Sequence, residues 1–425
     1  MALGRALGLS LPEPGAVLVG RDTRRSGPLL ESALAAGIAS AGVDVVLGGV
    51  LPTPAVAELV AADGALVAGV VISASHNPFP DNGIKVFGPD GFKMTDEAEA
   101  TLEARVDDRD GARPIGGDVG EIRSWDGAAA RYRDTLIARA GVRLDGVRVA
   151  VDCANGATVT TAREVLLALG AEVVAIGVEP DGVNINVDCG STHLNALQTL
   201  VRDSGADLGL AFDGDGDRVL AVDGAGDPVD GDQILAALAL WLNERGDLPG
   251  PAVVTTTMTN LGFRRAMADN GIEVRWTDVG DRHVLAEMRR HGLVLGGEQS
   301  GHLIHLASGP TGDGLAGGIL LLSALAERGI TLAEAAAAMT RMPQRLVSIR
   351  VERKHDLPGA AAVWDLVRAE EQALGADGRI VVRASGTEPL VRVMVEAPTS
   401  EECERIAGTI AGAAGQACGL VDGGH

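Results

Sequence analysis

The sequence predicts an α/β protein in which three related α/β domains with mixed, mainly parallel sheets are followed by a smaller α+β domain. One pattern occurs three times along the chain: an apolar strand, a small polar loop, a helical stretch and a second strand. Strands that alternate with helices of this length indicate βαβ units and parallel sheets covered on both faces. The tail has a different pattern, and 425 residues suffice for several domains of ~150 residues each.

The three copies are too widely spaced for a solenoid of stacked repeats, which indicates separate domains in tandem. In the first copy the first strand, the loop and the second strand lie at 17–19, 21–27 and 43–47. In the second copy they lie at 147–151, 153–156 and 173–176. In the third copy they lie at 253–257, 259–262 and 272–276. In each copy the polar loop leads into a helical stretch, as a βαβ crossover requires.

The tail reads as a small α+β domain because its strands are not separated by regular crossovers. Its expected strands lie at 346–351, 379–383 and 391–396, and its expected helices at 361–374 and from Ser400. We therefore expect domains at 1–138, 139–235, 236–345 and 346–425. No low-complexity linker separates them, so we expect close packing around an active site in a central cleft.

Composition excludes several classes of partner. The chain has 36 basic and 58 acidic residues and a net charge of −22, which excludes nucleic acids and anionic membranes as partners. Apolar runs such as 234–242 are far shorter than the ~20 residues of a membrane span, and the first 14 residues do not read as a signal peptide. The four cysteines are scattered without a CxxC pair, which favours a reduced, cytoplasmic setting.

The first loop with chemical character is Ser73-Ala74-Ser75-His76-Asn77-Pro78, after the apolar run 68–72. It puts a hydroxyl at the end of a strand, where α/β sheets bind ligands, although an ordinary turn stopped by proline would explain it too. Lys85 follows, in a chain whose 36 basic residues include only three lysines. An amine can lose a proton as a general base must, whereas a guanidinium cannot, so we expect a chemical role for Lys85; chance is the alternative.

The strongest signal is Asp213-Gly214-Asp215-Gly216-Asp217-Arg218 after the apolar strand 208–212. Three carboxylates separated only by glycine repel one another unless a hard cation lies among them. An EF-hand would need Gly and Glu where this chain has Arg218 and Gly224. Three carboxylates leave room for a phosphate oxygen, so we expect one Mg²⁺ per active site; a solvated acidic turn is the alternative.

Two further loops carry groups that bind sugars and phosphates. Glycines in the stretch 296–302 would let Glu298, Ser300 and His302 converge on sugar hydroxyls. In the tail, the arginine, two hydroxyls and exposed amides of Arg383-Ala384-Ser385-Gly386-Thr387-Glu388-Pro389 suit a phosphate. An ordinary glycine-rich turn and a Gly-Pro hairpin are the respective alternatives.

Taken together and in this order, the four loops resemble those of the α-D-phosphohexomutases, over nearly the whole chain. The residues 81–85 after the first loop, and Gln299 in the third where many relatives have Met, resemble the bacterial branch that acts on glucosamine phosphates. The resemblance implies interconversion of glucosamine 6-phosphate and glucosamine 1-phosphate, with glucosamine 1,6-bisphosphate as intermediate and activator, on the way to UDP-N-acetylglucosamine and the cell wall.

The resemblance also implies the roles of individual residues. Ser75 would carry the transferred phosphoryl group, with Lys85 and His76 as its catalytic neighbours. Mg²⁺ would be held by Ser75, through its phosphate, and by Asp213, Asp215 and Asp217. The hexosamine phosphate, the small-molecule partner of this protein, would be bound by Arg218, Glu298, Ser300, His302, Arg383, Ser385, Gly386 and Thr387. The expected assembly is a homodimer.

The sequence departs from the family pattern in three places. Ala384 replaces a common Lys or Pro and His283 replaces a common Tyr, and we attach no role to either. The family opens with a strand and a Gly-Ile-Arg-Gly turn that nothing here matches. We expect either a misplaced start codon or a first domain with a compromised sheet.

Three alternatives remain open at this point. The chain could act on mannose and glucose phosphates as other members of the family do. It could be an inactive sugar-phosphate-binding remnant that lacks the opening segment. It could also be a haloacid-dehalogenase-like phosphatase in which Asp213, not Ser75, is the nucleophile, because a strand followed by Asp-x-Asp fits that class too.

Overall fold

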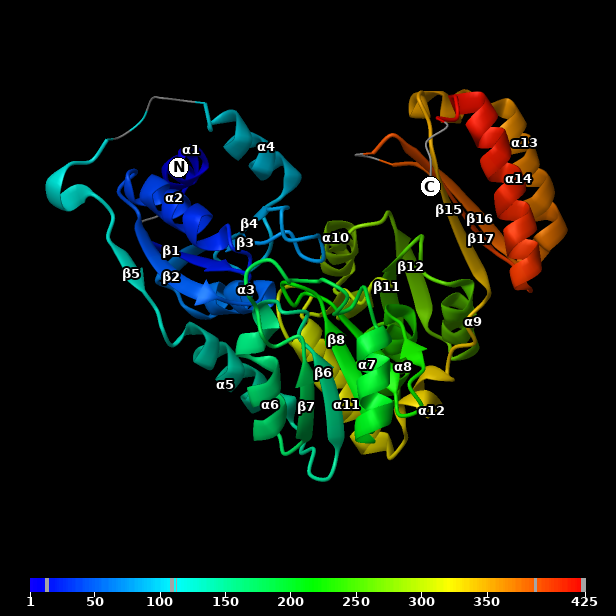
Figure 1. Ribbon diagram of the computed structural model, residues 1–425, viewed down its shortest axis with the longest axis horizontal. Coiled ribbons are helices and arrows are strands. Elements are labelled where there is room, and N and C mark those ends of the chain that lie inside the picture. The colour runs from blue at the N-terminus through cyan, green and yellow to red at the C-terminus, as the bar shows by residue number, and fades with distance from the viewer. Residues whose placement is uncertain (12–14, 108–110, 112, 386–387, 422–425) are drawn as a thin grey trace. The chain divides into compact units, whose positions relative to one another are not determined.

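The computed structural model describes residues 1–11, 15–107, 111, 113–385 and 388–421 (Figure 1). They form two compact units, each described by itself. The first unit comprises Met1–Met258 and Asn270–Ala338, and the second comprises Thr259–Asp269 and Met339–His425.

The first unit contains three sheets, and the first of them has the strand order β4-β3-β1-β2-β5. All neighbouring strands are parallel except β3 and β4. Helices α1, α2 and α4 share a core with one face, and α3 packs on β1 and β3 from the other. The elements are α1 (Ala2–Ser10), β1 (Ala16–Arg21), α2 (Gly27–Ala39), β2 (Asp44–Val50), α3 (Thr53–Ala62), β3 (Leu66–Ile72), β4 (Ile84–Phe87), α4 (Asp96–Ala104), η1 (Gly116–Asp118), β5 (Ile122–Ser124) and α5 (Ala128–Ala140).

The second sheet has the order β10-β9-β8-β6-β7, in which β6 pairs in parallel with β7 and β8, and β9 pairs antiparallel with β8 and β10. Its central strand β8 is buried along its whole length because α7 covers one face and α8 and α11 contact the other. The elements are β6 (Arg148–Asp152), η2 (Ala157–Thr160), α6 (Ala162–Ala168), β7 (Glu172–Ile176), α7 (Asn195–Ser204), β8 (Leu208–Phe212), β9 (Val219–Asp223), β10 (Pro228–Val229) and α8 (Gly231–Arg245).

The third sheet has the order β12-β11-β13-β14, in which only β13 and β14 are antiparallel. Helix α10 covers one face, and α8 and α11 contact β13 and β14. Gly296 and Gly297, expected in a loop, belong to strand β13, where a side chain at Gly296 would collide with Met288 and the Val254 carbonyl. The elements are β11 (Ala252–Thr256), β12 (Glu273–Thr277), α10 (Asp281–His291), β13 (Leu295–Gly297), β14 (Leu303–His305), α11 (Gly314–Arg328) and α12 (Leu332–Ala336).

The three sheets share one arrangement, which confirms the predicted relationship between the three α/β domains. In each, a first strand (β1, β6, β11) lies between two parallel neighbours, and the later neighbour (β3, β8, β13) turns back into an antiparallel partner. The connections at these turns are residues 73–83, 213–218 and 298–302. The three loops singled out in the sequence are therefore the same connection in three related sheets.

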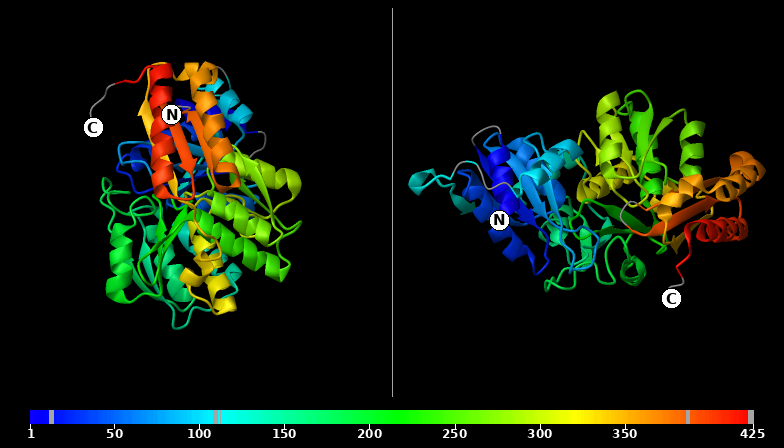
Figure 2. Two further views of the ribbon diagram at one scale, coloured as in Figure 1. Left: turned by 90° about the vertical axis from the view of Figure 1, so that its right-hand side faces the viewer. Right: turned by 90° about the horizontal axis from the view of Figure 1, so that it is seen from above.

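The second unit contains the predicted α+β tail. Its sheet is antiparallel throughout, with the order β15-β17-β16, and α13 and α14 lie side by side on it in every view (Figures 1 and 2). Helix α9, expected in the third α/β domain, belongs to this unit, since its Leu261 amide donates to Glu396 of β17. The elements are α9 (Leu261–Asp269), β15 (Gln344–Arg350), η3 (Lys354–Gly359), α13 (Ala361–Leu374), η4 (Gly375–Asp377), β16 (Arg379–Ala384), β17 (Leu390–Glu396) and α14 (Ser400–Cys418).

A chain so poor in aromatic residues builds its cores by close approach of helices. Where α1 crosses α2, a side chain on Gly4 would lie 2.2 Å from the Leu34 carbonyl, and one on Gly37 would lie 2.2 Å from the Met1 carbonyl. Glycine at both positions lets the two backbones touch, which replaces the volume that large side chains would fill. Throughout the described ranges, no helix combines the length and the apolar composition that a membrane crossing requires.

Candidate active site

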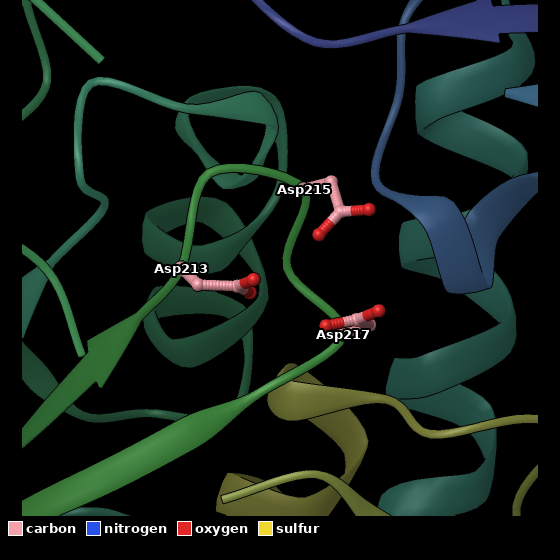
Figure 3. Close-up of side chains that lie close together, drawn as sticks. All are labelled: Asp213, Asp215 and Asp217. Carbon is pink, nitrogen blue, oxygen red and sulfur yellow. The ribbon is translucent and has the colours of Figure 1, made fainter. Parts of the chain in front are cut away.

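The connection between β8 and β9 gathers three buried carboxylates. Asp213, Asp215 and Asp217 are 1%, 0% and 5% exposed, and each offers an oxygen within 4.8 Å of the others' (Figure 3). Gly216 makes the turn with φ +73°, which favours glycine. Burial and the charges of Asp217 and Asp215 raise the pKa of Asp213 well above its usual value. Such a concentration of negative charge needs a cation.

In the structure that cation is the ammonium group of Lys85. Its Nζ donates to Oδ2 of Asp215 at 2.8 Å and to Oδ2 of Asp217 at 2.9 Å. Burial alone would lower the pKa of Lys85, but the two carboxylates raise it above its usual value. Lys85 lies on β4, the antiparallel partner in the first sheet, so the first domain supplies positive charge to the acidic loop of the second.

The carboxylate oxygens divide into those with partners and those without. Asp213 Oδ2 accepts from Ser75 Oγ at 2.6 Å, and its Oδ1 accepts from the Arg218 amide. Oδ1 of Asp215 and Oδ1 of Asp217 are buried without a hydrogen-bond partner among the described residues. Buried oxygens of this kind are costly unless they bind something. They fit a small divalent cation such as Mg²⁺, which prefers carboxylate oxygens and keeps further positions for phosphate or water.

Ser75 stands at the centre of the connection between β3 and β4. Its φ of +53° is unusual for a residue other than glycine, and it brings the hydroxyl to Asp213 across 138 positions of sequence. Nδ1 of His76 lies 3.4 Å from Ser75 Oγ. Burial and the charge of Arg218 lower the pKa of His76 below its usual value. The hydroxyl, the imidazole and the triad, expected from the sequence to act together, thus lie together.

Arg24 holds the conformation of this loop. No role for it was predicted from the sequence. It is 1% exposed, forms an ion pair with Asp22 at 2.8 Å, and donates to the backbone carbonyls of Ser75, Asn77, Pro78 and Asp81. Asp22 in turn accepts from Ser73 Oγ at 2.6 Å. A guanidinium with five donors in a fixed fork suits this task, which a lysine could not perform.

Asn186, from the second domain, was missed as well. Its Nδ2 donates to the Ser75 carbonyl at 2.9 Å and to the Asn77 carbonyl at 3.2 Å. Gly214 allows the approach of the two loops, because a side chain there would lie 2.6 Å from the Ser75 carbonyl. The second domain therefore holds the Ser75 loop by its backbone carbonyls and packs closely against it at Gly214.

The connection between β13 and β14 brings the third set of predicted residues to the triad. His302 is buried, with Nδ1 3.8 Å from Asp217 Oδ1, and burial, which lowers its pKa, is outweighed by the charge of Asp217, which raises it. Nε of Arg218 is likewise 3.8 Å from Asp217 Oδ1. Glu298 Oε1 accepts from the Gly280 amide at 3.0 Å. Ser300 Oγ and His302 Nε2 are buried without a partner in the described ranges, which leaves polar groups for a ligand.

The segment Gly312-Asp313-Gly314 supports both the histidine and the acidic loop. A side chain on Gly312 would lie 2.2 Å from His302 Nε2, and one on Gly314 would lie 2.3 Å from the Arg218 carbonyl. The Gly314 amide donates to the Gly216 carbonyl at 3.0 Å. Asp313 caps α11 and accepts from the buried Tyr132 hydroxyl at 2.7 Å. Only residues without side chains fit at the two glycine positions.

A cavity of about 250 Å³ opens beside His302. Residues 92–97 of the first domain and residues of α10 line it, among them Lys93, Asp281 and His283. The guanidinium of Arg289 stacks on the Phe92 ring at 3.9 Å. The cavity thus has apolar walls with charged groups at intervals, as sites for small polar ligands do.

The predicted phosphate loop lies in the second unit. Arg383 is the penultimate residue of β16 and pairs with Arg392 of β17. Burial together with the charge of Arg392 lowers the pKa of Arg383. Ser385 is buried, and its Oγ accepts from the Glu388 amide. Lys354 donates to the Ser385 carbonyl at 2.7 Å and to the Glu388 carbonyl at 3.0 Å. The assignment of this loop to a phosphate stays a prediction, and Gly386 and Thr387 lie outside the described residues.

The scarcity of lysine proves to be a usable signal. Lys85 binds the acidic triad, Lys93 lines the cavity beside His302, and Lys354 binds the carbonyls of the phosphate loop. All three lysines of the chain therefore lie at predicted site loops or next to them. Of the three lysines, only Lys85 was expected from the sequence to have a chemical role.

Models of protein families match the chain in four consecutive segments. They are described as phosphoglucomutase/phosphomannomutase alpha/beta/alpha domains I, II and III and the C-terminal domain, and they match residues 1–113, 130–226, 230–342 and 346–413. Together they cover most of the sequence in the order of the sheets described above.

Individual relatives and solved structures are similar to this chain over most of its length, in agreement with the family models. Phosphoglucosamine mutase of Frankia alni is 52% identical over 94% of this chain and 87% of its own. That of Shouchella clausii is 47% identical over 96% and 92%. A phosphoglucomutase/phosphomannomutase family protein of Burkholderia thailandensis has the same fold, with a TM-score of 0.82 and 27% identity over 99% of this chain and 94% of its own. A structure of Aspergillus fumigatus N-acetylphosphoglucosamine mutase in complex with GlcNAc-6P and magnesium shares the fold at a TM-score of 0.68, with 20% identity over 98% of each chain.

The four-segment match, the relatives at about half identity and the three equivalent loops around Ser75 and the acidic triad agree with one another. This chain is a member of the phosphoglucomutase/phosphomannomutase family, the α-D-phosphohexomutases.

Proposed function

We propose that the chain interconverts glucosamine 6-phosphate and glucosamine 1-phosphate through a phosphoserine at Ser75 and a 1,6-bisphosphate intermediate. The observation that carries this proposal is the hydrogen bond of 2.6 Å from Ser75 Oγ to Asp213, one of three buried carboxylates that share one space. A serine at that place can hold a phosphoryl group against a cation. The choice of sugar rests on the relatives named phosphoglucosamine mutase.

The reaction consists of two phosphoryl transfers. In the first, the bond between phosphorus and Ser75 Oγ breaks, a bond from O1 of glucosamine 6-phosphate to phosphorus forms, and the O1 proton leaves to a base. His76, with Nδ1 3.4 Å from Ser75 Oγ, is positioned to accept or return that proton. The 1,6-bisphosphate then turns around, and its 6-phosphoryl group returns to Ser75 Oγ, which leaves glucosamine 1-phosphate.

Charge on the transferring group is offset by this chain's cations. Of the two roles expected for Lys85, charge stabilisation is favoured over general base, because its ammonium already binds two carboxylates and lies beside the Ser75 loop. Arg24 and Asn186 hold the loop in position, so that the hydroxyl needs no reorganisation before it reacts.

The proposed cofactor is one Mg²⁺, held by Oδ1 of Asp215, Oδ1 of Asp217, Asp213 and an oxygen of phosphorylated Ser75. Bound there, it would neutralise negative charge on the phosphoryl oxygens. The two orphaned Oδ1 atoms support this assignment.

The sugar and its second phosphate are assigned to the remaining loops. Glu298, Ser300, His302 and Arg218 would bind the sugar, and Arg383, Ser385, Gly386 and Thr387 the phosphate that is not transferred. The donors around Ser385 and the unpartnered groups of Ser300 and His302 support these roles.

Two further assignments complete the proposal. The setting is the cytoplasm, which fits the four unpaired, buried cysteines, Cys153, Cys189, Cys403 and Cys418. A homodimer stays a prediction, for which light scattering during gel filtration is the measurement.

The experiment is an assay of purified protein with Mg²⁺ and glucosamine, glucose and mannose 6-phosphates, each with a trace of its 1,6-bisphosphate. Phosphorus NMR follows formation of the 1-phosphate. We expect the highest kcat/KM for glucosamine 6-phosphate, by about tenfold or more. A higher value for mannose or glucose phosphate would support the second candidate, a phosphomannomutase/phosphoglucomutase of the same family. Folded protein without any 1-phosphate product would overturn both.

A further inference from the structure

A hydroxyl from the first domain reaches into the acidic triad. Thr53, the first residue of α3, donates from Oγ1 to Asp215 Oδ2 at 2.5 Å, although the two residues are 162 positions apart. The Thr53 amide donates to the Asp215 backbone carbonyl at 2.8 Å. Thr53 is 2% exposed and Asp215 is fully buried. Asp215 is therefore fixed by one residue at its backbone and its side chain.

The hydroxyl of Thr53 is not used by its own helix. A threonine at the start of a helix commonly caps it by accepting from an amide of the first turn. Here Pro52 occupies the cap position, and the helix has no side-chain cap. The hydroxyl is thus free to serve the neighbouring domain, while the helix start supplies an ordered backbone that aims it.

The consequence lies in the two oxygens of Asp215. Oδ2 accepts from both Thr53 Oγ1 and Lys85 Nζ, which occupies its lone pairs. Oδ1 is buried and has no hydrogen-bond partner among the described residues. One oxygen is therefore held by the protein, and the other is left without a protein partner among the described residues, in a carboxylate that has an oxygen within 4.8 Å of oxygens of Asp213 and Asp217.

We propose that Thr53 is a positioning residue for the metal ligand Asp215. It holds Oδ2 so that only Oδ1 faces the cation, and it sets the affinity of the triad for a divalent ion. Partners that orient a ligating carboxylate typically change metal affinity by about 10- to 100-fold. The inference rests on the proposed metal site, but not on the identity of the sugar.

The test measures metal binding directly, without turnover. Purified wild type, Thr53→Val, Thr53→Ser and Thr161→Val are titrated with Mn²⁺, and free Mn²⁺ is followed by electron paramagnetic resonance. Thr161 is the matched control, since it is also buried and its hydroxyl donates to the Thr158 backbone carbonyl instead of a carboxylate of the triad. Circular dichroism melting confirms that each variant is folded.

We expect the Kd for Mn²⁺ to rise at least about tenfold in Thr53→Val and to stay near the wild-type value in Thr53→Ser and Thr161→Val. In the mutase assay, Thr53→Val should need more Mg²⁺ for half-maximal rate, with a smaller change in kcat at saturating Mg²⁺. If Thr53→Val does not fold, Thr53→Ala takes its place in the same titration.

Two failures can be told apart. A wild-type protein that binds no Mn²⁺ would overturn the proposed metal site itself. A wild-type protein that binds Mn²⁺ with the same Kd as the folded variant without the hydroxyl would overturn the role of Thr53 alone and leave the metal site standing.

Discussion

Lys85 Nζ lies 2.8 Å from Asp215 Oδ2, although the two residues are separated by 130 positions of sequence and belong to different sheets. The same ammonium group also binds Asp217 at 2.9 Å. It is the positive charge nearest to the buried carboxylates of Asp215 and Asp217. The surroundings of the triad are thus built from two domains, and the first domain contributes both the Ser75 hydroxyl and this ammonium group.

Removal of this ammonium should destabilise the protein most when metal is absent. Lys85→Met leaves Asp215 without its ion pair and Asp217 with only the more distant Arg218 and His302, so we expect a loss of about 3 kcal/mol of unfolding free energy in EDTA. Saturating Mg²⁺ should restore a large part of it, because a bound cation replaces the lost charge. Urea unfolding in EDTA and in Mg²⁺ measures both values. Lys93→Met is the matched control, and an equal loss with and without Mg²⁺ would contradict the account.

Arg24 should be needed for the geometry of the Ser75 loop. Arg24→Lys keeps the charge but cannot reach Asp22 and four carbonyls at once. We expect kcat/KM to fall about 100-fold, because a small displacement of a reacting group costs that much. Arg25→Lys is the control, because Arg25 is the next residue in the chain and its side chain is exposed. Steady-state kinetics and the phosphate content of Ser75 by mass spectrometry are the measurements. Equal activity of the two variants would show that Arg24 has no such role.

Gly312 should be required for the place of His302. A methyl group at Gly312 would lie 2.2 Å from His302 Nε2, so Gly312→Ala must displace the imidazole. If His302 binds the sugar, KM for the hexosamine phosphate should rise about tenfold or more. Gly309→Ala is the matched control in the same loop, where the added carbon would have its nearest neighbour at 3.7 Å. An unchanged KM in Gly312→Ala would argue against the assigned role of His302.

The chemistry of the loops could be predicted because it is local in sequence. The loops that contain Ser75, the three aspartates and His302 each begin directly after an apolar run, and a strand that ends in polar residues marks a ligand-binding edge. The strands expected from the sequence lie within a few residues of strands in the structure, whereas the short strands β4, β5, β9, β10 and β14 were not expected. The prediction differed at Gly296 and Gly297, which were expected in a loop but belong to β13. Met288 of α10 leaves no room for a side chain at Gly296, and His302 and Leu303 leave little at Gly297.

The residues that hold the site together could not be predicted, because their roles arise from contacts between distant segments. Arg24 is one of several arginines in a polar stretch, and nothing local marks it as buried. Local sequence suggests only a helix cap for Thr53 and a turn residue for Asn186. Their roles depend on contacts between the first and second domains, which the local sequence does not show. The scarcity of lysine could have drawn attention to Lys354, but not to the Ser385 carbonyl that it binds 31 positions away.

Asp313 should make stability depend on pH. Burial raises its pKa to about 6 from 3.8, against the opposing effects of the Ala316 amide and Tyr132. Because the folded state binds this proton more tightly than the unfolded state, its contribution is complete below about pH 3.8 and is lost as pH rises to about 6. Asp313→Asn lacks the titration but keeps an acceptor for the helix cap. We expect its unfolding free energy to rise relative to wild type by up to about 3 kcal/mol over this interval. Urea unfolding at several pH values measures this difference. If the unfolding free energies of wild type and Asp313→Asn changed in parallel with pH, Asp313 would not be the source of the pH dependence.

The central claim is that Ser75 carries the phosphoryl group that moves between the two positions of the sugar. The most direct measurement loads the protein with ³²P from labelled glucosamine 1,6-bisphosphate and then adds unlabelled glucosamine 6-phosphate with Mg²⁺. Ser32→Ala, which removes an exposed helical hydroxyl, serves as the control for Ser75→Ala.

We predict acid-stable label on Ser75 in wild type and in Ser32→Ala, none in Ser75→Ala, and transfer of the label to sugar phosphate during the chase. Label that appears on Ser75→Ala in a base-labile form, or that leaves the wild type as inorganic phosphate instead of sugar phosphate, would contradict the account and favour an aspartyl phosphatase at Asp213.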